Sequence, residues 1–405
     1  MSRLVAVVFV MLGALVPATD PAGSLPLHSR LDAASVPVVA AAGDIVCQSN
    51  TPSPTECRHR QTSDLLVGRG FDAVLPLGDL QYNTGSLSAF QTYYDPTWGR
   101  VKGITHPVPG NHEYLTAGAA GYFAYFGSAA GDPAKGYYSF DLGAWHLIAL
   151  NSNCGAVGGC HAGSAQERWL RADLAAHQAV CTLAYWHHPR FTSGSVHESD
   201  VAMRPFWQAL YDQGADVVLS GHQHNYERYA PQTPAGDRDD AKGVLQFVVG
   251  TGGRSLYPFG PPQRNSIVRS DTAFGVLTMT LHPTWFGWAF LSETGATIDS
   301  GSAACSGQAG IGRLSVDLEG KPGKVDRPGR RVRLRATVAP CVPPGHGEVA
   351  FQRRRLGTWR TMDTVATDDS CVASIKRRVR RTTRYRAVFP AADAISAVFK
   401  IRVMR

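Results

Sequence analysis

Short apolar runs recur through the first part of the chain, and most of them end in a cluster of glycine and polar side chains. The runs are 38–42, 73–77, 145–150, 182–186, 217–219 and 245–249. They do not alternate strictly between apolar and polar residues, which is typical of strands covered on both faces. A capping box from Ser164 to Glu167 and the pattern of 201–213 predict helices between the runs. The sequence therefore predicts an α/β fold, with its site at the carboxyl ends of the strands.

Five polar clusters occur in order along this part, and their side chains are of the kinds that bind metal ions. They are Gly43-Asp44, Gly78-Asp79-Leu80-Gln81-Tyr82, Gly110-Asn111-His112-Glu113, His187-His188-Pro189 and Gly221-His222-Gln223-His224. Each cluster alone is a weak signal, whereas the ordered set is specific. Two carboxylates, a phenol, an amide oxygen and three imidazoles can hold two metal ions that share one carboxylate. On an extended backbone His222 and His224 point to the same face, so that each can serve one ion.

The ordered clusters resemble the calcineurin-like metallophosphoesterase superfamily and, within it, the purple acid phosphatase branch. Many relatives carry Asp-x-His in the first motif, whereas Val46 stands at that histidine position here. Tyr82, three residues after Asp79, matches the branch instead, as does the segment from Gly221 to Arg228. The resemblance covers about residues 36–300. It implies a metallophosphoesterase βαβ sandwich, in which two sheets are flanked by helices.

The resemblance also implies a role for each site residue. A ferric ion would be held by Asp44, Asp79, Tyr82 and His224, and a divalent zinc, iron or manganese ion by Asp79, Asn111, His187 and His222. The phenolate of Tyr82 on ferric iron would colour the protein purple or pink. His112 and His197 fall where the family places histidines that contact the substrate or donate a proton, and His188 is left as a neighbour of the ligands.

Such a site points to hydrolysis of phosphate monoesters, with small-molecule phosphate esters as substrates. Two metal ions would clamp the phosphoryl oxygens and lower the pKa of a bound water, supplying a hydroxide for in-line attack. A cationic His112 or His197 would protonate the leaving alkoxide, which favours acidic conditions. A phosphodiesterase for cyclic nucleotides or glycerophosphodiesters is an alternative on the same site. A third hypothesis is a cell-surface binding protein with a vestigial site. The presence of every expected metal ligand argues against this hypothesis.

The N-terminus and the cysteines indicate export. Arg3 precedes an apolar run at 4–15 and a small residue, Ala18, which is the order of a secretory signal and too short a run to span a bilayer. We expect residues 1–30 to be a signal peptide and tail, and the protein to be secreted or at the cell surface. The even number of cysteines predicts disulfides. Pairing of near neighbours gives Cys47–Cys57, Cys154–Cys160 and Cys341–Cys371, which leaves Cys181 with Cys305.

The positive charge of the chain belongs to its C-terminal part. Residues 311–405 contain 22 Lys and Arg against 8 Asp and Glu, a net charge of +14, so the earlier residues carry −6. We expect a catalytic domain at 31–303, a linker at 304–310 and a basic immunoglobulin-like β-sandwich at 311–405, with strands near 331–338, 348–354 and 384–389. The sandwich either accompanies the enzyme or binds anionic cell-wall polymer. Aromatic residues that could stack on bases are sparse there, so no nucleic-acid partner is expected.

Overall fold

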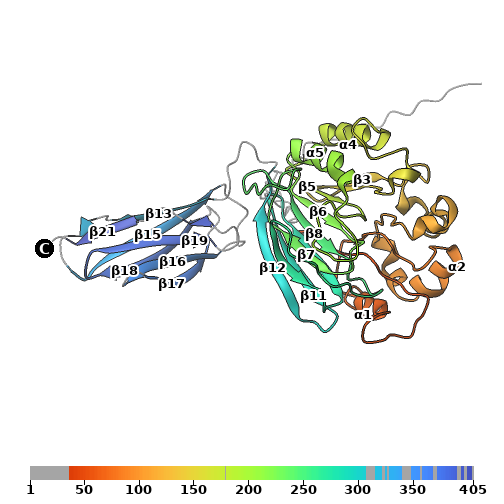
Figure 1. The fold of residues 1–405 in the computed structure, drawn as a ribbon. Coiled ribbons are helices and arrows are strands. Elements are labelled where there is room, and N and C mark those ends of the chain that lie inside the picture. The colour runs from red at the N-terminus through yellow and green to blue at the C-terminus, as the bar shows by residue number, and fades with distance from the viewer. Residues whose placement is uncertain are drawn as a thin grey trace, which may run out of the picture. The chain divides into compact units, whose positions relative to one another are not determined.

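The computed structural model describes residues 36–177, 179–306, 315–321, 324–325, 328–339, 348–355, 358–367, 372–389, 394–395 and 399–403. These residues form mixed sheets flanked by helices, followed by further sheets toward the C-terminus (Figure 1). The predicted α/β class is therefore confirmed. The predicted signal peptide at 1–30, most of the predicted linker and the predicted Cys341–Cys371 bridge lie outside the described residues.

The first sheet has five strands in the order β12-β11-β10-β1-β2. Their bounds are β1 (Val38–Ala42), β2 (Ala73–Pro76), β10 (Gly275–Leu281), β11 (Trp285–Ser292) and β12 (Thr297–Ala304). β1 and β2 are parallel, so their carboxyl ends lie side by side. Residues of a helical region pack in the same apolar cluster. This region contains the helices α1 (His59–Asp64), α2 (Leu87–Ala89) and α3 (Ala120–Phe126), together with 3₁₀ and π segments at Phe90–Tyr94, Trp98–Ile104, Glu113–Leu115, Ala117–Ala119 and Gly127–Ala130.

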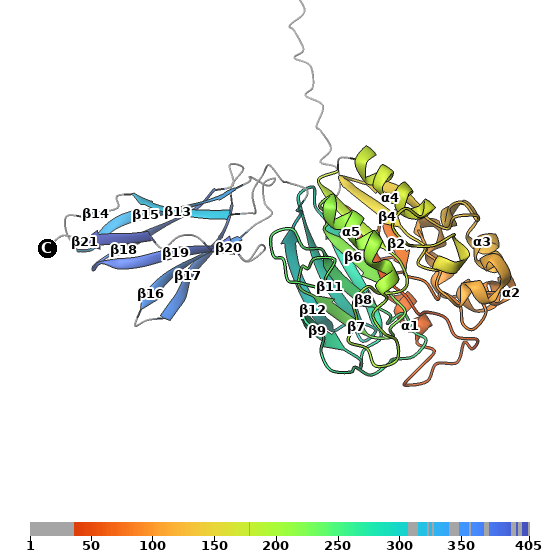
Figure 2. The same ribbon diagram turned by 45° about the horizontal axis from the view of Figure 1, so that its top comes forward.

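The second sheet has seven strands in the order β3-β4-β5-β6-β8-β7-β9. Their bounds are β3 (Tyr138–Leu142), β4 (Trp145–Ala149), β5 (Cys181–Tyr185), β6 (Val217–Ser220), β7 (Tyr226–Tyr229), β8 (Leu245–Val249) and β9 (Ser266–Ser270), with a short turn at Cys154–Ala156. The four strands β4, β5, β6 and β8 are parallel. Helices α4 (Ala165–Ala176) and α5 (Arg204–Asp212) lie side by side in both views (Figures 1 and 2).

The two helices begin where local sequence signals place them. The hydroxyl of Ser164 accepts a hydrogen bond from the N–H of Glu167, as the capping box predicts. The second helix begins at Arg204 rather than at 201, because a 3₁₀ turn at Val201–Met203 precedes it. Pro205 lies in the first turn of α5, where its missing N–H costs no hydrogen bond.

Both faces of the parallel strands are buried, which explains their continuous apolar character. Along β5, Leu183 and Tyr185 belong to the apolar cluster shared with the five-stranded sheet. Ala184 and the following Trp186 belong to the cluster shared with α4 and α5. One sheet therefore packs against the other, and helices cover the outer face of the seven-stranded sheet.

Two further sheets form the C-terminal part of the described chain. One has the order β13-β15-β18, and the other has the order β14-β21-β19-β16-β17 with β20 beside β19. Their bounds are β13 (Ser315–Lys321), β14 (Lys324–Val325), β15 (Arg330–Ala339), β16 (Glu348–Arg355), β17 (Thr358–Ala366), β18 (Val372–Val379), β19 (Thr383–Phe389), β20 (Ala394–Ile395) and β21 (Phe399–Val403). Leu334, Phe351 and Ile401 share one buried cluster, so the two sheets have a common core. An immunoglobulin-like domain at 311–405 stays a prediction.

Three disulfides agree with the pairs expected from the sequence: Cys47–Cys57, Cys154–Cys160 and Cys181–Cys305. The last pair joins the start of β5 to the residue that follows β12. Strand β12 ends at Ala304, the first residue of the predicted linker at 304–310. No helix in the described ranges combines the length and the apolar character needed to cross a membrane.

A buried carboxylate ties the two sheets together. Asp299 on β12 accepts hydrogen bonds from the Tyr226 hydroxyl at 2.7 Å and from Arg228 Nε at 2.7 Å and Nη2 at 3.1 Å, both on β7. It also accepts from Trp288 Nε1 at 3.2 Å on β11. Because Asp299 has four donors and little exposure, its loss would leave the charge of Arg228 largely buried without a partner.

Replacing Asp299 by Ala should therefore lower the free energy of unfolding by about 3–5 kcal/mol. Chemical denaturation followed by circular dichroism measures the change. The matched control is Asp240→Ala, which removes an exposed ion pair with Arg238 and should cost about 0–1 kcal/mol. Equal losses in the two variants would contradict the role of Asp299 as a tie between the sheets.

Candidate metal centre

The predicted ligands lie at the carboxyl ends of strands from both sheets. Asp44 follows β1 and Asp79 follows β2, while His187 and His222 follow β5 and β6. The chain segments after β1 and β2 stay hydrogen-bonded to each other beyond the sheet. The segment that leads to Asn111 also runs parallel to β2. Parallel pairing thus brings distant parts of the sequence to one edge.

One group of the predicted ligands surrounds the hydroxyl of Tyr82. This oxygen lies 2.9 Å from Asp44 Oδ1, 3.0 Å from Asp79 Oδ2 and 2.9 Å from His224 Nε2. A phenol has one hydrogen, so it cannot donate to all three neighbours. Burial, followed by the carboxylates of Asp44 and Asp79, raises the pKa of Tyr82. The phenol therefore keeps its proton unless a cation neutralises the carboxylates.

A second group surrounds Nε2 of His187. This nitrogen lies 3.3 Å from Asp79 Oδ2, 3.2 Å from Asn111 Oδ1 and 3.1 Å from His222 Nδ1. Nδ1 of His187 donates to the carbonyl of Leu77 at 2.8 Å, so Nε2 of the neutral ring carries a lone pair. Burial would lower the pKa of His187, but the carboxylate of Asp79 outweighs it and raises the pKa to about 9. The group thus attracts a positive charge.

Both groups consist mainly of acceptor atoms that face one another, and Asp79 belongs to both. A cation within each group would satisfy these acceptors, and the donors are carboxylate, phenol, amide and imidazole, which suit zinc, iron and manganese. The residues therefore fit two metal ions.

Glu113 holds the segments that carry Asp79 and Asn111. Its buried carboxylate accepts hydrogen bonds from the N–H groups of Asp79 and Leu80, each at 2.9 Å, and of Gly110 at 2.7 Å. Burial and the charge of Asp79 raise the pKa of Glu113 to about 7, although the backbone donors oppose the shift. This side chain acts as a clamp between the ends of two chain segments.

Three of the predicted ligands adopt a backbone conformation that non-glycine residues rarely take. Asp44, Asp79 and His222 have φ of 60°, 50° and 67°. Such residues cluster at functional sites, where the surrounding structure holds them in place. Gly78 is needed for close approach, because a Cβ there would lie 2.6 Å from Nδ1 of His187.

The two predicted catalytic histidines flank the ligands. His112 donates its backbone N–H to Asp79 Oδ1 at 2.8 Å, and its Nδ1 lies 2.6 Å from the carbonyl of Asn83. The ring of His197 stacks on His222 with centres 4.0 Å apart. Burial, and then the neighbouring histidines, lowers the pKa of His197. Both histidines therefore line the centre without belonging to the two groups of acceptors.

Two residues that no sequence motif indicated orient His224. Ser255 Oγ lies 3.1 Å from His224 Nδ1, and the ring of Tyr257 stacks on that imidazole at 3.9 Å. Both follow strand β8, which runs into Gly250 and two further glycines. The same signal of an apolar run followed by glycines could have identified this segment.

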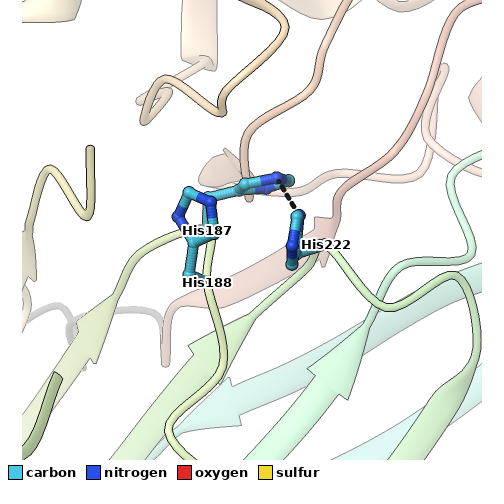
Figure 3. Close-up of side chains that lie close together, drawn as sticks. All are labelled: His187, His188 and His222. Carbon is cyan, nitrogen blue, oxygen red and sulfur yellow. Dashed lines mark hydrogen bonds between the residues drawn. The ribbon is translucent and has the colours of Figure 1, made fainter. Parts of the chain in front are cut away.

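His188 also lies at the centre. Figure 3 shows its ring beside those of His187 and His222, from which its centre is 4.9 and 4.4 Å away. Ser152, another residue that the sequence did not single out, lies 2.7 Å from Nδ1 of His188.

Comparisons with known proteins agree with this geometry. A family model described as calcineurin-like phosphoesterase matches residues 38–226. The chain is 27% identical over 251 residues to purple acid phosphatase 15 of Arabidopsis thaliana, covering 53% of this chain and 44% of that protein. It is 30% identical over 225 residues to acid phosphatase type 7 of Homo sapiens, and this match covers 47% of this chain and 50% of that protein. The chain thus spans about half the length of the curated relatives it matches.

A solved structure, that of GAP50, the anchor in the inner membrane complex of Plasmodium, has a similar fold. Its TM-score is 0.52 at 14% identity, and the match covers 66% of this chain and 89% of that chain. The family model thus indicates a calcineurin-like phosphoesterase domain at residues 38–226, and the similar fold agrees with it. This domain is homologous to the purple acid phosphatases, as the sequence motifs indicate.

Replacing Glu113 by Gln should lower the free energy of unfolding by about 2–4 kcal/mol, because the amide offers fewer acceptor sites to buried N–H groups. Urea denaturation measures this loss. Glu348→Gln, at an exposed position on β16, serves as the control and should stay within about 0.5 kcal/mol of the unaltered protein. A Glu113 variant as stable as the control would rule out the clamp.

Proposed function

We propose that the chain is a secreted, metal-dependent phosphatase of the purple acid phosphatase type that hydrolyses phosphate monoesters. The observation that carries the proposal is the pair of acceptor groups around Tyr82 and His187, which share Asp79. The homology to purple acid phosphatases supports the same chemistry.

We assign a ferric ion to Asp44, Asp79, Tyr82 and His224, and a divalent zinc, iron or manganese ion to Asp79, Asn111, His187 and His222. Asp79 is the one residue common to the two sets, which makes it the bridging carboxylate. When bound, the two ions supply positive charge for the phosphoryl oxygens and lower the pKa of a water molecule that becomes the nucleophile.

The histidines that flank the ligands handle the ester and its proton. The hydrogen on Nδ1 of His112 is directed to the carbonyl of Asn83, so the second hydrogen of the cationic ring, on Nε2, is the one available to protonate the leaving alkoxide. His197 is held through its backbone N–H, which donates to Gln223 Oε1 at 3.0 Å, and its ring contacts the phosphate. Glu113 keeps the loops in register while these contacts form.

Export and domain organisation belong to the same proposal. Three disulfides suit a protein that leaves the reducing cytosol. We assign residues 1–30 to a signal peptide and tail, 31–303 to the catalytic domain, 304–310 to a linker and 311–405 to a basic immunoglobulin-like domain.

The C-terminal sheets support a second function, binding to anionic cell-wall polymer. Along β15, Arg331, Arg333 and Arg335 are exposed and alternate with buried apolar residues. Arg331 lies opposite Arg378 on β18, and Arg333 lies opposite Lys376. Like charges that face each other across strands destabilise a sheet, so a polyanion would stabilise this face.

The catalytic proposal predicts three properties of the purified protein. It should contain iron, show a visible absorption band, and hydrolyse p-nitrophenyl phosphate faster at acidic than at neutral pH. Tyr82→Phe should lose the band and retain the fold, because only the phenolic oxygen is removed. Metal analysis, absorption spectra and turnover on the same sample measure all three.

Tyr93→Phe is the matched control, because it removes a phenol outside the proposed ligand set and should leave the colour unchanged. Zinc or manganese without colour, but with turnover, would refute the ferric assignment. Faster turnover of bis-p-nitrophenyl phosphate would favour the phosphodiesterase. A protein that contains no metal and hydrolyses neither ester would refute the hydrolase.

The second function predicts salt-sensitive retention on anionic wall material. Changing Arg331, Arg333 and Lys376 to Gln should lower the salt concentration needed for elution, because fewer counterions are released on binding. The three changes should not reduce the melting temperature, since they remove repulsion. Changing Arg60, Arg69 and Arg204, which are exposed in the phosphoesterase domain, is the control. Equal elution of the two variants would exclude the basic face as the binding surface.

A further inference from the structure

The orientation of His188 is set by a serine rather than by a metal ligand. Ser152 Oγ accepts the backbone N–H of His188 at 3.1 Å and lies 2.7 Å from Nδ1 of its ring. Among the described residues, this nitrogen is the only hydrogen-bond partner of the Ser152 hydroxyl besides the N–H of His188, so we assign the hydroxyl hydrogen to Nδ1. A neutral imidazole that accepts at Nδ1 carries its own hydrogen on Nε2.

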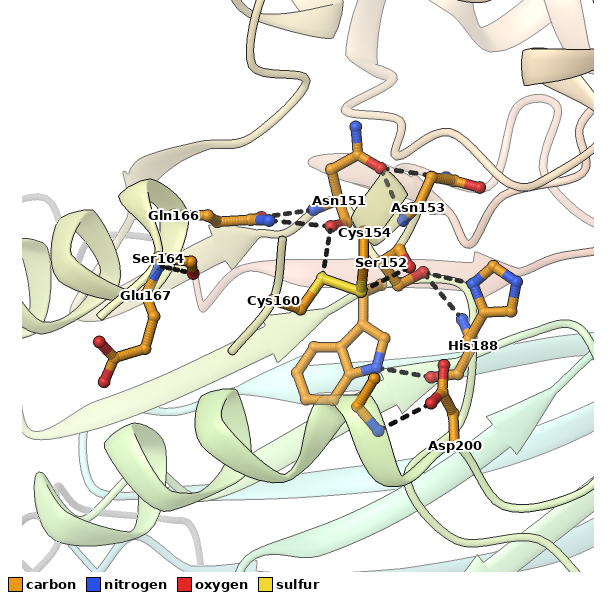
Figure 4. The surroundings of a disulfide bond; sticks show 12 residues. Asn151, Ser152, Asn153, Cys154, Cys160, Ser164, Gln166, Glu167, His188 and Asp200 are labelled. Carbon is orange, nitrogen blue, oxygen red and sulfur yellow. Dashed lines mark hydrogen bonds between the residues drawn. A yellow bond between two sulfur atoms is a disulfide. The ribbon is translucent and has the colours of Figure 1, made fainter. Parts of the chain in front are cut away.

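Ser152 is held in a tightly fixed loop, residues 151–160, which we term the Cys154 loop (Figure 4). The Cys154–Cys160 disulfide closes it. Gln166 on α4 binds both backbone groups of Asn151, with its Oε1 2.7 Å from the N–H nitrogen and its Nε2 2.9 Å from the carbonyl oxygen. The serine that orients His188 therefore has little freedom to move.

The same loop also contacts a second segment of the metal centre. Asn153 Nδ2 donates to the carbonyl of Pro109 at 3.1 Å, one residue before the Gly110-Asn111 motif. Asn151 Nδ2 donates to the hydroxyl of Tyr114 at 2.7 Å. The loop thus connects the segment after β5 with the segment that carries Asn111.

His188 is close enough to the centre to act on a bound ester. One of its nitrogens lies within 4.8 Å of a ligand nitrogen on each of His187 and His222. Its side chain is half-buried, so part of the ring remains accessible. A hydrogen-bond donor on this ring would therefore lie near an ester bound beside the two predicted ligands.

We propose that His188 is a substrate-contacting residue, whose Nε2–H donates to a phosphoryl oxygen, and that Ser152 and the Cys154 loop position it. The inference rests on the proposed phosphatase function and adds a residue to it. A hydrogen bond to a charged oxygen is stronger than one between neutral groups, so its loss should weaken phosphate binding clearly.

A further metal ligand is the competing role for His188, since its nitrogen is close to two ligand nitrogens. A ligand must present a lone pair to the ion. In the tautomer we assign, the Ser152 hydroxyl uses the lone pair on Nδ1, which leaves a hydrogen on the other nitrogen. Metal content distinguishes the two roles.

The test compares inhibition by inorganic phosphate, turnover of p-nitrophenyl phosphate and metal content in four variants. His188→Ala should raise both the inhibition constant and KM about tenfold, with metal content unchanged. Ser152→Ala should shift both in the same direction by a smaller factor. His188→Gln should recover part of the affinity, because its amide N–H can replace Nε2–H. Ser139→Ala, which removes a hydroxyl contact to Asp173, is the matched control and should leave both unchanged.

Unchanged phosphate inhibition in His188→Ala would overturn the inference, as would a loss of metal, which would make His188 a ligand. Loss of affinity that His188→Gln does not recover, together with a lower melting temperature, would assign it a structural role and overturn the inference too. If the unaltered protein hydrolyses no ester, the proposed function itself has failed, a result distinct from an active protein with unaffected variants.

Discussion

Mutual repulsion among buried acceptor atoms is the constraint on which the rest of this structure depends. Carboxylate, phenol and imidazole atoms from Asp44, Asp79, Tyr82 and His187 face one another with few hydrogens between them. Uncompensated polar atoms are costly inside a protein. Three features hold these side chains in place. They are the backbone hydrogen bonds beyond β1 and β2, the hydrogen bonds of Glu113, and the contact of His187 with the carbonyl of Leu77. Cations at this position would turn the repulsion into attraction.

The two-sheet architecture follows from the same constraint. The five-stranded sheet supplies the carboxylates at the ends of β1 and β2, and the seven-stranded sheet supplies the imidazoles after β5 and β6. Each sheet alone supplies only part of the predicted ligands, so the centre requires a fixed relation between the two sheets. The shared apolar cluster, the contacts of Asp299 with β7 and the Cys181–Cys305 disulfide provide it. A rigid frame of this kind can hold Asp44 and Asp79 at unfavourable backbone angles.

The sequence was sufficient to predict the elements whose causes are local. These elements are the continuous apolar strands, the helix start at Ser164 and the polar clusters after strands. Each of them is indicated by residues within one short stretch of the sequence. Sequence reasoning could not predict Ser152 or Ser255, because a lone serine gains its role only through a neighbour that is distant in the sequence. Nor did the sequence indicate that β12 would include the glycine and serine residues just before the predicted linker, where Gly301 packs closely against Trp288.

The central claim is that the acceptor atoms around Tyr82 and His187 form two cation sites that share Asp79. Anomalous diffraction from crystals of the protein with its native metals tests this claim most directly. Data collected on both sides of the iron edge and of the zinc edge locate each ion and identify its element. The account predicts two peaks, one among Asp44, Tyr82 and His224 and one among Asn111, His187 and His222, with Asp79 between them. A single peak, or peaks only elsewhere in the molecule, would contradict it.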